Sequence, residues 1–163
     1  MANRDSNWTN KDGLVVGFGT RSVESTFSAK PSVKSYVQEI VCRVKGADLA
    51  DAVVTEQLVH APVIPAGAHI QSATLYVKTA FAGTNAVMDI GLYNLAGTAV
   101  NDAGIDAAIA VTAIDADDDE VACDGALVGT VVDVACKVGV TYDTAAFTAG
   151  DATLVLKYQV PLT

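Results

Sequence analysis

The chain has 163 residues, of which 51% are hydrophobic and only 6% aromatic, so it can bury one core filled mainly by small side chains. No apolar run reaches the roughly 20 residues of a membrane helix, and the polar start of the chain does not fit a secretion signal, so we expect a soluble protein without membrane contact. A net charge of −9 argues against binding to nucleic acid or anionic membranes.

The charges are unevenly distributed along the chain. Residues 1–46 carry seven basic and four acidic side chains, whereas residues 47–163 carry three basic and fifteen acidic ones. The basic part is therefore suited to meet an acidic surface, either on the rest of the chain or on a partner.

The first 26 residues are polar and rich in glycine, with a few large apolar residues among them. Two interpretations stay open: a strand that folds back onto the body, or an arm that becomes ordered on a partner protein. We predict the second, with an N-terminal docking segment at 1–26 and a single domain at 27–163. Aromatic and basic side chains are common energetic anchors at interfaces. The predicted partner-docking residues are Arg4, Trp8, Lys11, Phe18 and Arg21.

Two strands are expected next, over Ser32–Lys45 and Ala52–Val59. In the first, one face from Tyr36 to Val44 is suited to a core, and the alternate face from Val37 to Lys45 becomes basic and is suited to solvent or an interface. Prolines at positions 62 and 65 end the second strand.

The next stretch predicts a β-hairpin. Ile70–Phe81 and Val87–Leu95 are rich in strand-forming residues, and Ala82–Asn85 contains turn residues. Each run alternates, so one face of each should be buried. The residues expected in the core are Leu75, Val77, Met88, Ile90 and Leu92.

Apolar residues recur at helical spacing in Ala103–Ile114, and Asn101 and Asp102 precede them as possible caps. We predict one short inserted helix here, with a buried strand as the competing interpretation. Asp115–Glu120 follows and is predicted to be a solvated acidic loop, since it lacks the glycine and the final glutamate of an EF-hand calcium loop.

The last part of the chain predicts three more strands, over Ala126–Val134, Cys136–Thr141 and Ala152–Val160. About eight closely spaced strands with turn residues between them are typical of an all-β fold. We predict a jelly-roll or Greek-key β-sandwich with one short inserted helix and an extended N-terminal segment.

Candidate catalytic and metal-binding residues are few. The cysteines at 42, 123 and 136 are odd in number and widely spaced, which favours small buried side chains in a reducing compartment over disulfides or a zinc site. His60 and His69 lack further ligands at a telling spacing, and the sequence contains no nucleophile elbow, zinc-protease or phosphate-loop motif. We expect no enzyme activity, no cofactor and no metal.

Several runs resemble the head decoration proteins of tailed bacteriophages, over about residues 60–160. The runs are Ile64–Ile70, Ser72–Val77, Ala86–Leu92, Phe147–Asp151 and Leu154–Tyr158. The resemblance implies a virion protein that binds the outer capsid surface as a homotrimer, contacts the major capsid protein and acts as a cement against the pressure of packaged DNA. It assigns no binding role to any single residue. The alternative is a carbohydrate-binding or tail-fibre-type β-sandwich, which would need exposed aromatic side chains; Tyr76, Tyr93 and Tyr158 are scattered and are expected to be packed.

Overall fold

A computed structural model describes residues 6–9, 15–18, 37–51, 58 and 61–160. The chain divides into two compact units, Met1–Ser32 and Val33–Thr163, called here the N-terminal unit and the body. In the N-terminal unit, β1 (Ser6–Thr9) and β2 (Val15–Phe18) pair antiparallel. The boundary predicted at residue 26 falls outside the described residues.

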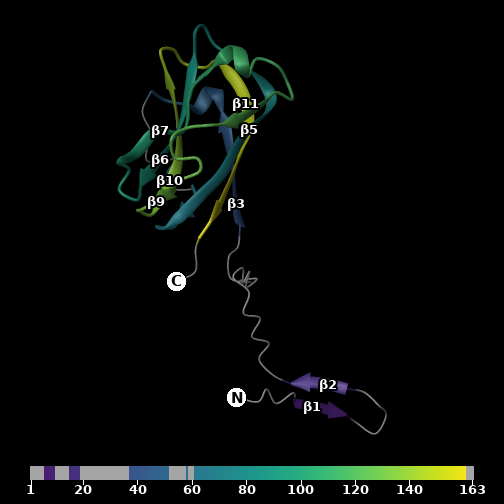
Figure 1. The fold of residues 1–163 in the computed structure, drawn as a ribbon. Coiled ribbons are helices and arrows are strands. Elements are labelled where there is room, and N and C mark those ends of the chain that lie inside the picture. Colours follow the sequence, from purple (N-terminus) through teal and green to yellow (C-terminus); the bar gives the residue numbers. More distant parts are fainter. Residues whose placement is uncertain (1–5, 10–14, 19–36, 52–57, 59–60, 161–163) are drawn as a thin grey trace. The chain divides into compact units, whose positions relative to one another are not determined.

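The described part of the body consists mainly of strands, with two short 3-10 turns (Figure 1). Its strands are β3 (Val37–Lys45), β4 (Val63–Ile64), β5 (Ala68–Ala82), β6 (Val87–Asn94), β7 (Ala99–Ala110), β8 (Glu120–Cys123), β9 (Val131–Val132), β10 (Cys136–Asp143) and β11 (Ala149–Gln159). The 3-10 turns are η1 (Gly46–Asp48) and η2 (Val111–Ala113).

The strands form two sheets with the topology of a jelly roll. One sheet has the order β3-β11-β5-β8, with β9 also paired to β5, and the other has the order β4-β10-β6-β7. The chain passes repeatedly from one sheet to the other, so that the first strand of the body pairs with the last and the second with the last but one. All these pairs are antiparallel. The predicted all-β sandwich is confirmed.

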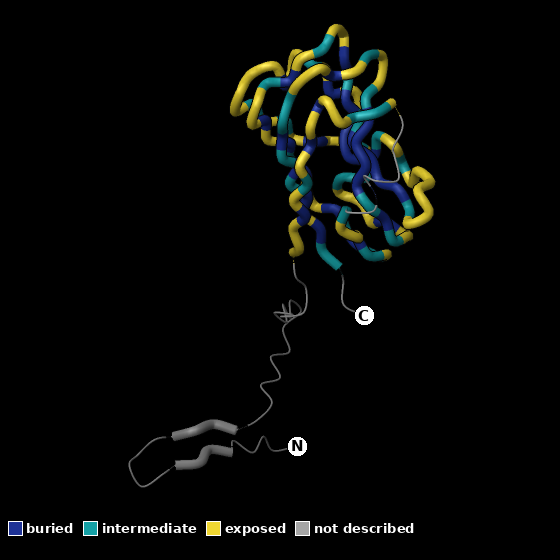
Figure 2. The backbone as a smooth tube through the Cα atoms, turned by 180° about the vertical axis from the view of Figure 1, so that it is seen from behind, coloured by how far each residue is buried: buried dark blue, intermediate teal, exposed yellow. Residues whose placement is uncertain are grey.

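The core lies between the sheets, and alternation along the strands builds much of it, most clearly in β11 (Figure 2). In β11, Ala152, Leu154, Leu156 and Tyr158 are buried while the residues between them are more exposed. Small and branched side chains fill the space between the two layers, as the low aromatic content led us to expect. The final strand predicted from the sequence is therefore confirmed.

The predicted hairpin is right in its burial and wrong in its pairing. Leu75, Val77, Met88, Ile90 and Leu92 are all buried. However, β5 pairs with β11, β8 and β9, whereas β6 lies in the other sheet.

Backbone hydrogen bonds at the turn explain this arrangement. The Ala82 carbonyl accepts from the Thr148 N–H at 2.8 Å, and the Ala86 carbonyl accepts from the Val111 N–H at 3.0 Å. The ends of β5 and β6 therefore bond to distant segments, and the turn joins the two sheets.

The predicted helix over Ala103–Ile114 is wrong, because β7 and η2 occupy this stretch. Ile105 and Ile109 are buried, but these two residues are four apart and share a face in a strand as well as in a helix. Ala108 and Thr112, which fit only the helical pattern, are exposed. The competing strand interpretation is therefore the correct one.

The strand predicted over Ala126–Val134 is wrong except at Val131–Val132. Gly125–Thr130 forms turns that join the edges of both sheets. The N–H of Leu127 donates to the Gly104 carbonyl of β7 at 2.8 Å, and the N–H of Gly129 donates to the Ile70 carbonyl of β5 at 2.8 Å. The segment therefore covers polar backbone groups at one side of the sandwich.

The first predicted strand is confirmed over β3, where Ile40 and Val44 are buried and the alternate residues are exposed. The strand predicted at Ala52–Val59 lies outside the described residues, apart from Leu58, which is buried and helical and so does not fit the prediction.

β11 begins with a bulge that requires glycine. The pairing with β5 shifts between Ala149 and Asp151, and Gly150 adopts a φ of 127°. A Cβ atom at this position would lie 2.3 Å from the ring of Phe81, which contacts Phe147 edge-to-face with centroids 5.4 Å apart. The bulge lets the strand close over this aromatic pair.

Candidate interaction surfaces

The five predicted docking residues all belong to the N-terminal unit. In the β1–β2 ladder, Trp8 is opposite Val16, and Phe18 is opposite Ser6. These register positions place Trp8 and Phe18 on one face of the ladder. Arg4, Lys11 and Arg21 lie outside the described residues. The structure thus brings the two aromatic residues to one face, and the docking role of all five residues stays a prediction.

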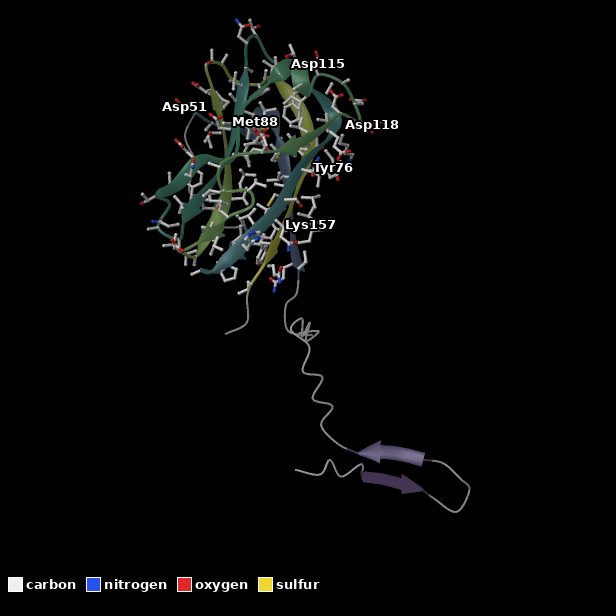
Figure 3. The ribbon with its side chains drawn as sticks, in the orientation of Figure 1. Asp51, Tyr76, Met88, Asp115, Asp118 and Lys157 are labelled. Atoms are coloured by element: carbon white, nitrogen blue, oxygen red, sulfur yellow. The ribbon has the colours of Figure 1, made fainter. Side chains whose placement is uncertain are left out.

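The acidic loop after η2 is confirmed as an exposed loop, and Asp115 and Asp118 protrude from the body in Figure 3. Two of its carboxylates bond to the backbone: Asp117 Oδ1 accepts from the Ala80 N–H at 2.8 Å, and Asp119 Oδ2 accepts from the Ala116 N–H at 2.9 Å. Within the described residues no three side chains of the metal-binding types form a group that could hold an ion. These carboxylates shape the turn.

The outer face of the sheet β3-β11-β5-β8 carries cross-strand ion pairs. Arg43 donates from Nε and Nη2 to the two carboxylate oxygens of Asp151, at 2.8 and 2.5 Å. These hydrogen bonds and the guanidinium charge hold the pKa of Asp151 below its usual value. Lys157 lies 3.9 Å from Glu39 on the neighbouring strand. The Lys157–Glu39 pair is solvated and contributes little to stability, whereas the Asp151 side chain is only 18% exposed in its two-fold contact with Arg43.

Aromatic side chains on the strands bear on the carbohydrate alternative. Tyr93 and Tyr158 are buried as expected, and Tyr158 donates its hydroxyl to Gln38 Oε1 at 2.5 Å. Tyr76 is 43% exposed on the outer face, so the expectation that it is packed is wrong (Figure 3). A sheet face with a single exposed tyrosine among the described residues is a weak platform for a sugar ring.

The three cysteines are free thiols. Cys136 and Cys123 are buried, whereas Cys42 is only partly buried, so the prediction of buried cysteines holds for two of the three. Burial, helped by the nearby Asp106 carboxyl, raises the pKa of Cys123 to about 12, and burial raises that of Cys136 to about 11. Such thiols stay protonated and are poor nucleophiles.

A buried carboxyl is the main electrostatic feature of the core. Asp106 in β7 is 6% exposed. Burial raises its pKa above the usual value, although hydrogen bonds from the Ala107 backbone and the Cys123 thiol act in the opposite direction. No sequence pattern indicated this group, since the predicted helix would have turned Asp106 toward solvent.

A hollow of about 430 Å³ lies between β3 and β10. Its lining is mostly apolar and includes Val44, Leu49 and Val138. Asp48 supplies a carboxylate and lies 4.0 Å from the Lys45 amino group. This arrangement does not form the acid–base pair that a catalytic site would need.

Exposed apolar side chains gather at one end of the body. Six of the eight exposed large apolar residues among the described ones belong to this apolar end, namely Val37, Val63, Leu95, Val100, Val131 and Val134. Sequence reasoning missed this surface, because residues at strand ends and in turns follow no periodic pattern.

The strand registers place these apolar residues at the same end. Across one sheet, Val37 pairs with Gln159, Gln159 with His69, and His69 with Val131. Across the other, Val63 pairs with Lys137, Lys137 with Tyr93, and Tyr93 with Ala99. Leu95 and Val134 lie in the adjoining turns.

The described residues form no helix that is both long and apolar enough to cross a membrane. No protein-family model matches the sequence, and no curated protein matches it significantly.

Two solved structures resemble this chain. One belongs to the capsid of Ralstonia phage GP4; it is 17% identical, with a TM-score of 0.50, and the match covers 87% of this chain and 94% of that chain. The other belongs to the capsid asymmetric unit of cyanophage Pam1; it is 15% identical, with a TM-score of 0.53, and the match covers 87% of this chain and 98% of that one. The likeness establishes a shared fold over almost the whole of each matched chain.

Proposed function

We propose that this chain is a structural subunit of a phage virion that binds the outside of the assembled capsid, as a homotrimer, and stabilises it against internal pressure. The observation that carries the proposal is the likeness to chains from two phage capsids, each of which is covered almost completely.

Other features agree with a structural role. The body is a jelly roll in which strands far apart in the sequence pair with each other, such as β3 with β11. This architecture is common in viral capsid proteins. Its buried thiols and its solvated acidic loop do not form a reactive site. We accordingly propose a binding role without catalysis, cofactor or nucleic acid.

The N-terminal unit is the proposed docking segment. It contains the only tryptophan of the chain, and Trp8 and Phe18 occupy one face of its ladder. Arg4, Lys11 and Arg21 would add charge-assisted hydrogen bonds to carboxylates or carbonyls of the capsid protein.

Binding to capsid shells tests the proposal. The probe is empty shells, purified without this chain from the virus that encodes it. The full chain should bind them saturably and raise their disruption temperature. Removal of residues 1–26 should leave the β-type circular dichroism spectrum of the body unchanged. It should abolish most of the binding to the shells.

A point substitution sharpens the test. Trp8→Ala should weaken binding by roughly 2 kcal/mol or more, about thirtyfold in affinity. Asn7→Ala, at a register position on the opposite face of the ladder, is the matched control and should have little effect. Normal binding by the truncated chain would show that the segment is dispensable.

The second candidate is a carbohydrate-binding module, favoured by the exposed ring of Tyr76. Jelly rolls also occur in lectins. A glycan array with the isolated chain separates the two: sugar binding that Tyr76→Ala abolishes would support the module.

A further inference from the structure

The two ends of the body differ in chemistry. The apolar end defined above carries six of the exposed large apolar side chains. The opposite end, called here the acidic end, holds the turns after β3, β5 and β10 and the loop before β8 (Figures 1 and 3). Its exposed carboxylates include Asp48, Asp51, Asp115, Asp117, Asp118 and Asp143. An exposed group of apolar side chains on a soluble domain commonly marks an interaction site.

Among the described residues, the apolar end also carries few exposed charged side chains. The amino group of Lys137 donates a hydrogen bond to the Leu58 carbonyl and is thereby engaged within the body. Asp102 and Asp133 are the exposed carboxylates nearby. The cores of protein interfaces are likewise depleted in charged residues, and their rims are polar.

The position of the chain ends adds an independent argument. Val37 and Gln159 are register partners, so the first and last strands of the body begin and end at the apolar end. The 36 residues that precede Val37, which include the proposed docking segment, therefore join the body here. Along the chain, the proposed docking segment therefore leads into the apolar end and not into the acidic end.

We propose that the body docks end-on, with the apolar end against an apolar and weakly charged surface of the capsid shell and the acidic end directed to solvent. This inference rests on the proposed function and adds the orientation of the subunit. The reverse orientation would desolvate at least five carboxylates, which is costly without paired cations. Facing outward, the same carboxylates make particles repel one another.

Matched double substitutions test the orientation. Leu95→Gln with Val134→Gln changes two exposed turn residues of the apolar end. Val41→Gln with Tyr76→Gln changes two similarly exposed residues on the outer face of the β3-β11-β5-β8 sheet. Glutamine preserves net charge in both variants. Binding of each variant and of the full chain to the empty shells is measured by co-sedimentation, and a melting curve checks that each variant is folded.

We expect at least tenfold weaker binding for the apolar-end variant and less than threefold change for the face variant. Hydrogen exchange of the bound full chain, which needs no substitution, should show protection at 95–100 and 131–134 and none at 115–118.

The contrary outcomes are distinct. If the face variant loses binding and the apolar-end variant keeps it, or if protection appears at 115–118 instead, the orientation is wrong while the proposed function stands. If the full chain does not bind shells, both fail. If the chain forms an oligomer in solution that Leu95→Gln with Val134→Gln dissociates, a second copy covers the apolar end and the inference is wrong.

Discussion

β11 and β7 are strands of similar length, with 11 and 12 residues, but they differ in regularity. β11 lies between β3 and β5; its nine pairs with β3 run without a shift, and its shifts against β5 lie near its two ends, so that Ala152–Lys157 pairs regularly on both sides. β7 lies at the end of its sheet, and its pairing with β6 shifts three times. It also contains Ala108 with a φ of 57° and the buried Asp106. A strand with long partners on both sides shows its alternation in the sequence, whereas an edge strand held by turns does not.

The largest expected effect is in β11. Leu154→Ala should reduce the free energy of unfolding by about 2–5 kcal/mol, because the side chain is fully buried between Cys42 and Leu75 of the neighbouring strands. Val155→Ala, one residue further on and partly exposed, is the matched control and should cost about 1 kcal/mol or less. Urea unfolding of the two variants measures the difference. Similar losses would contradict the regular alternation of β11.

A substitution in β7 is expected to increase the free energy of unfolding, by a smaller amount than Leu154→Ala reduces it. The raised pKa of Asp106 means that the folded state binds a proton more tightly than the unfolded state, so this group makes the protein less stable as pH rises through its folded-state pKa. Asp106→Asn should therefore increase stability at pH 7 by on the order of 1 kcal/mol and remove this part of the pH dependence.

Thermal melts between about pH 2 and pH 8 measure this effect, because the Asp106 contribution changes above the ordinary carboxyl pKa and the Asp151 contribution below it. Asp151→Asn is the control of opposite sign, because the pKa of Asp151 is lowered and its contribution is lost as pH falls. A lower melting temperature for Asp106→Asn at pH 7 would show that the buried charge is stabilising.

The smallest expected effect concerns the kink in β7. Ala108→Gly should raise the free energy of unfolding by about 0.5 kcal/mol, because glycine adopts a positive φ without the steric cost that alanine pays there. The substitution keeps the hydrogen bond from the Ala108 N–H to Asp89 Oδ1, at 2.7 Å. Ala107→Gly, at an exposed neighbour without this backbone geometry, should lower stability by a similar amount. If denaturant unfolding shows that both variants lose the same free energy of unfolding, the backbone at Ala108 is not strained.

The sequence predicted those parts of the fold that local periodicity determines. The buried set of β5 and β6, the faces of β3 and the course of β11 follow from apolar residues at every second position. The pairing of β5 with β11 does not, because the turn at Ala82–Asn85 is compatible with a hairpin and with a crossing between sheets. Pairing between distant strands depends on which other strands are available to pair at the same sheet edge. A local sequence pattern contains no information about this.

β7 and the candidate interaction surfaces were harder to predict for separate reasons. Ile105 and Ile109 satisfy both the helical and the strand period, so their spacing could not decide between them. The apolar end combines residues from several strand ends and turns, which only the topology brings together. For the N-terminal unit, composition alone suggested docking, and the structure adds the shared face of Trp8 and Phe18.

The pairing of β3 with β11 has a consequence for how the protein is made. Arg43 and Asp151, which bond across these strands, are 108 residues apart in the chain. At translation rates of about 5–20 residues per second, the nascent β3 waits on the order of 10 s for its partner to leave the ribosome. During that time β5 also lacks β11, and apolar strand faces are open to other chains. High contact order slows folding as well, so we expect the fold to be completed only after β11 has left the ribosome, and a requirement for chaperones at high expression.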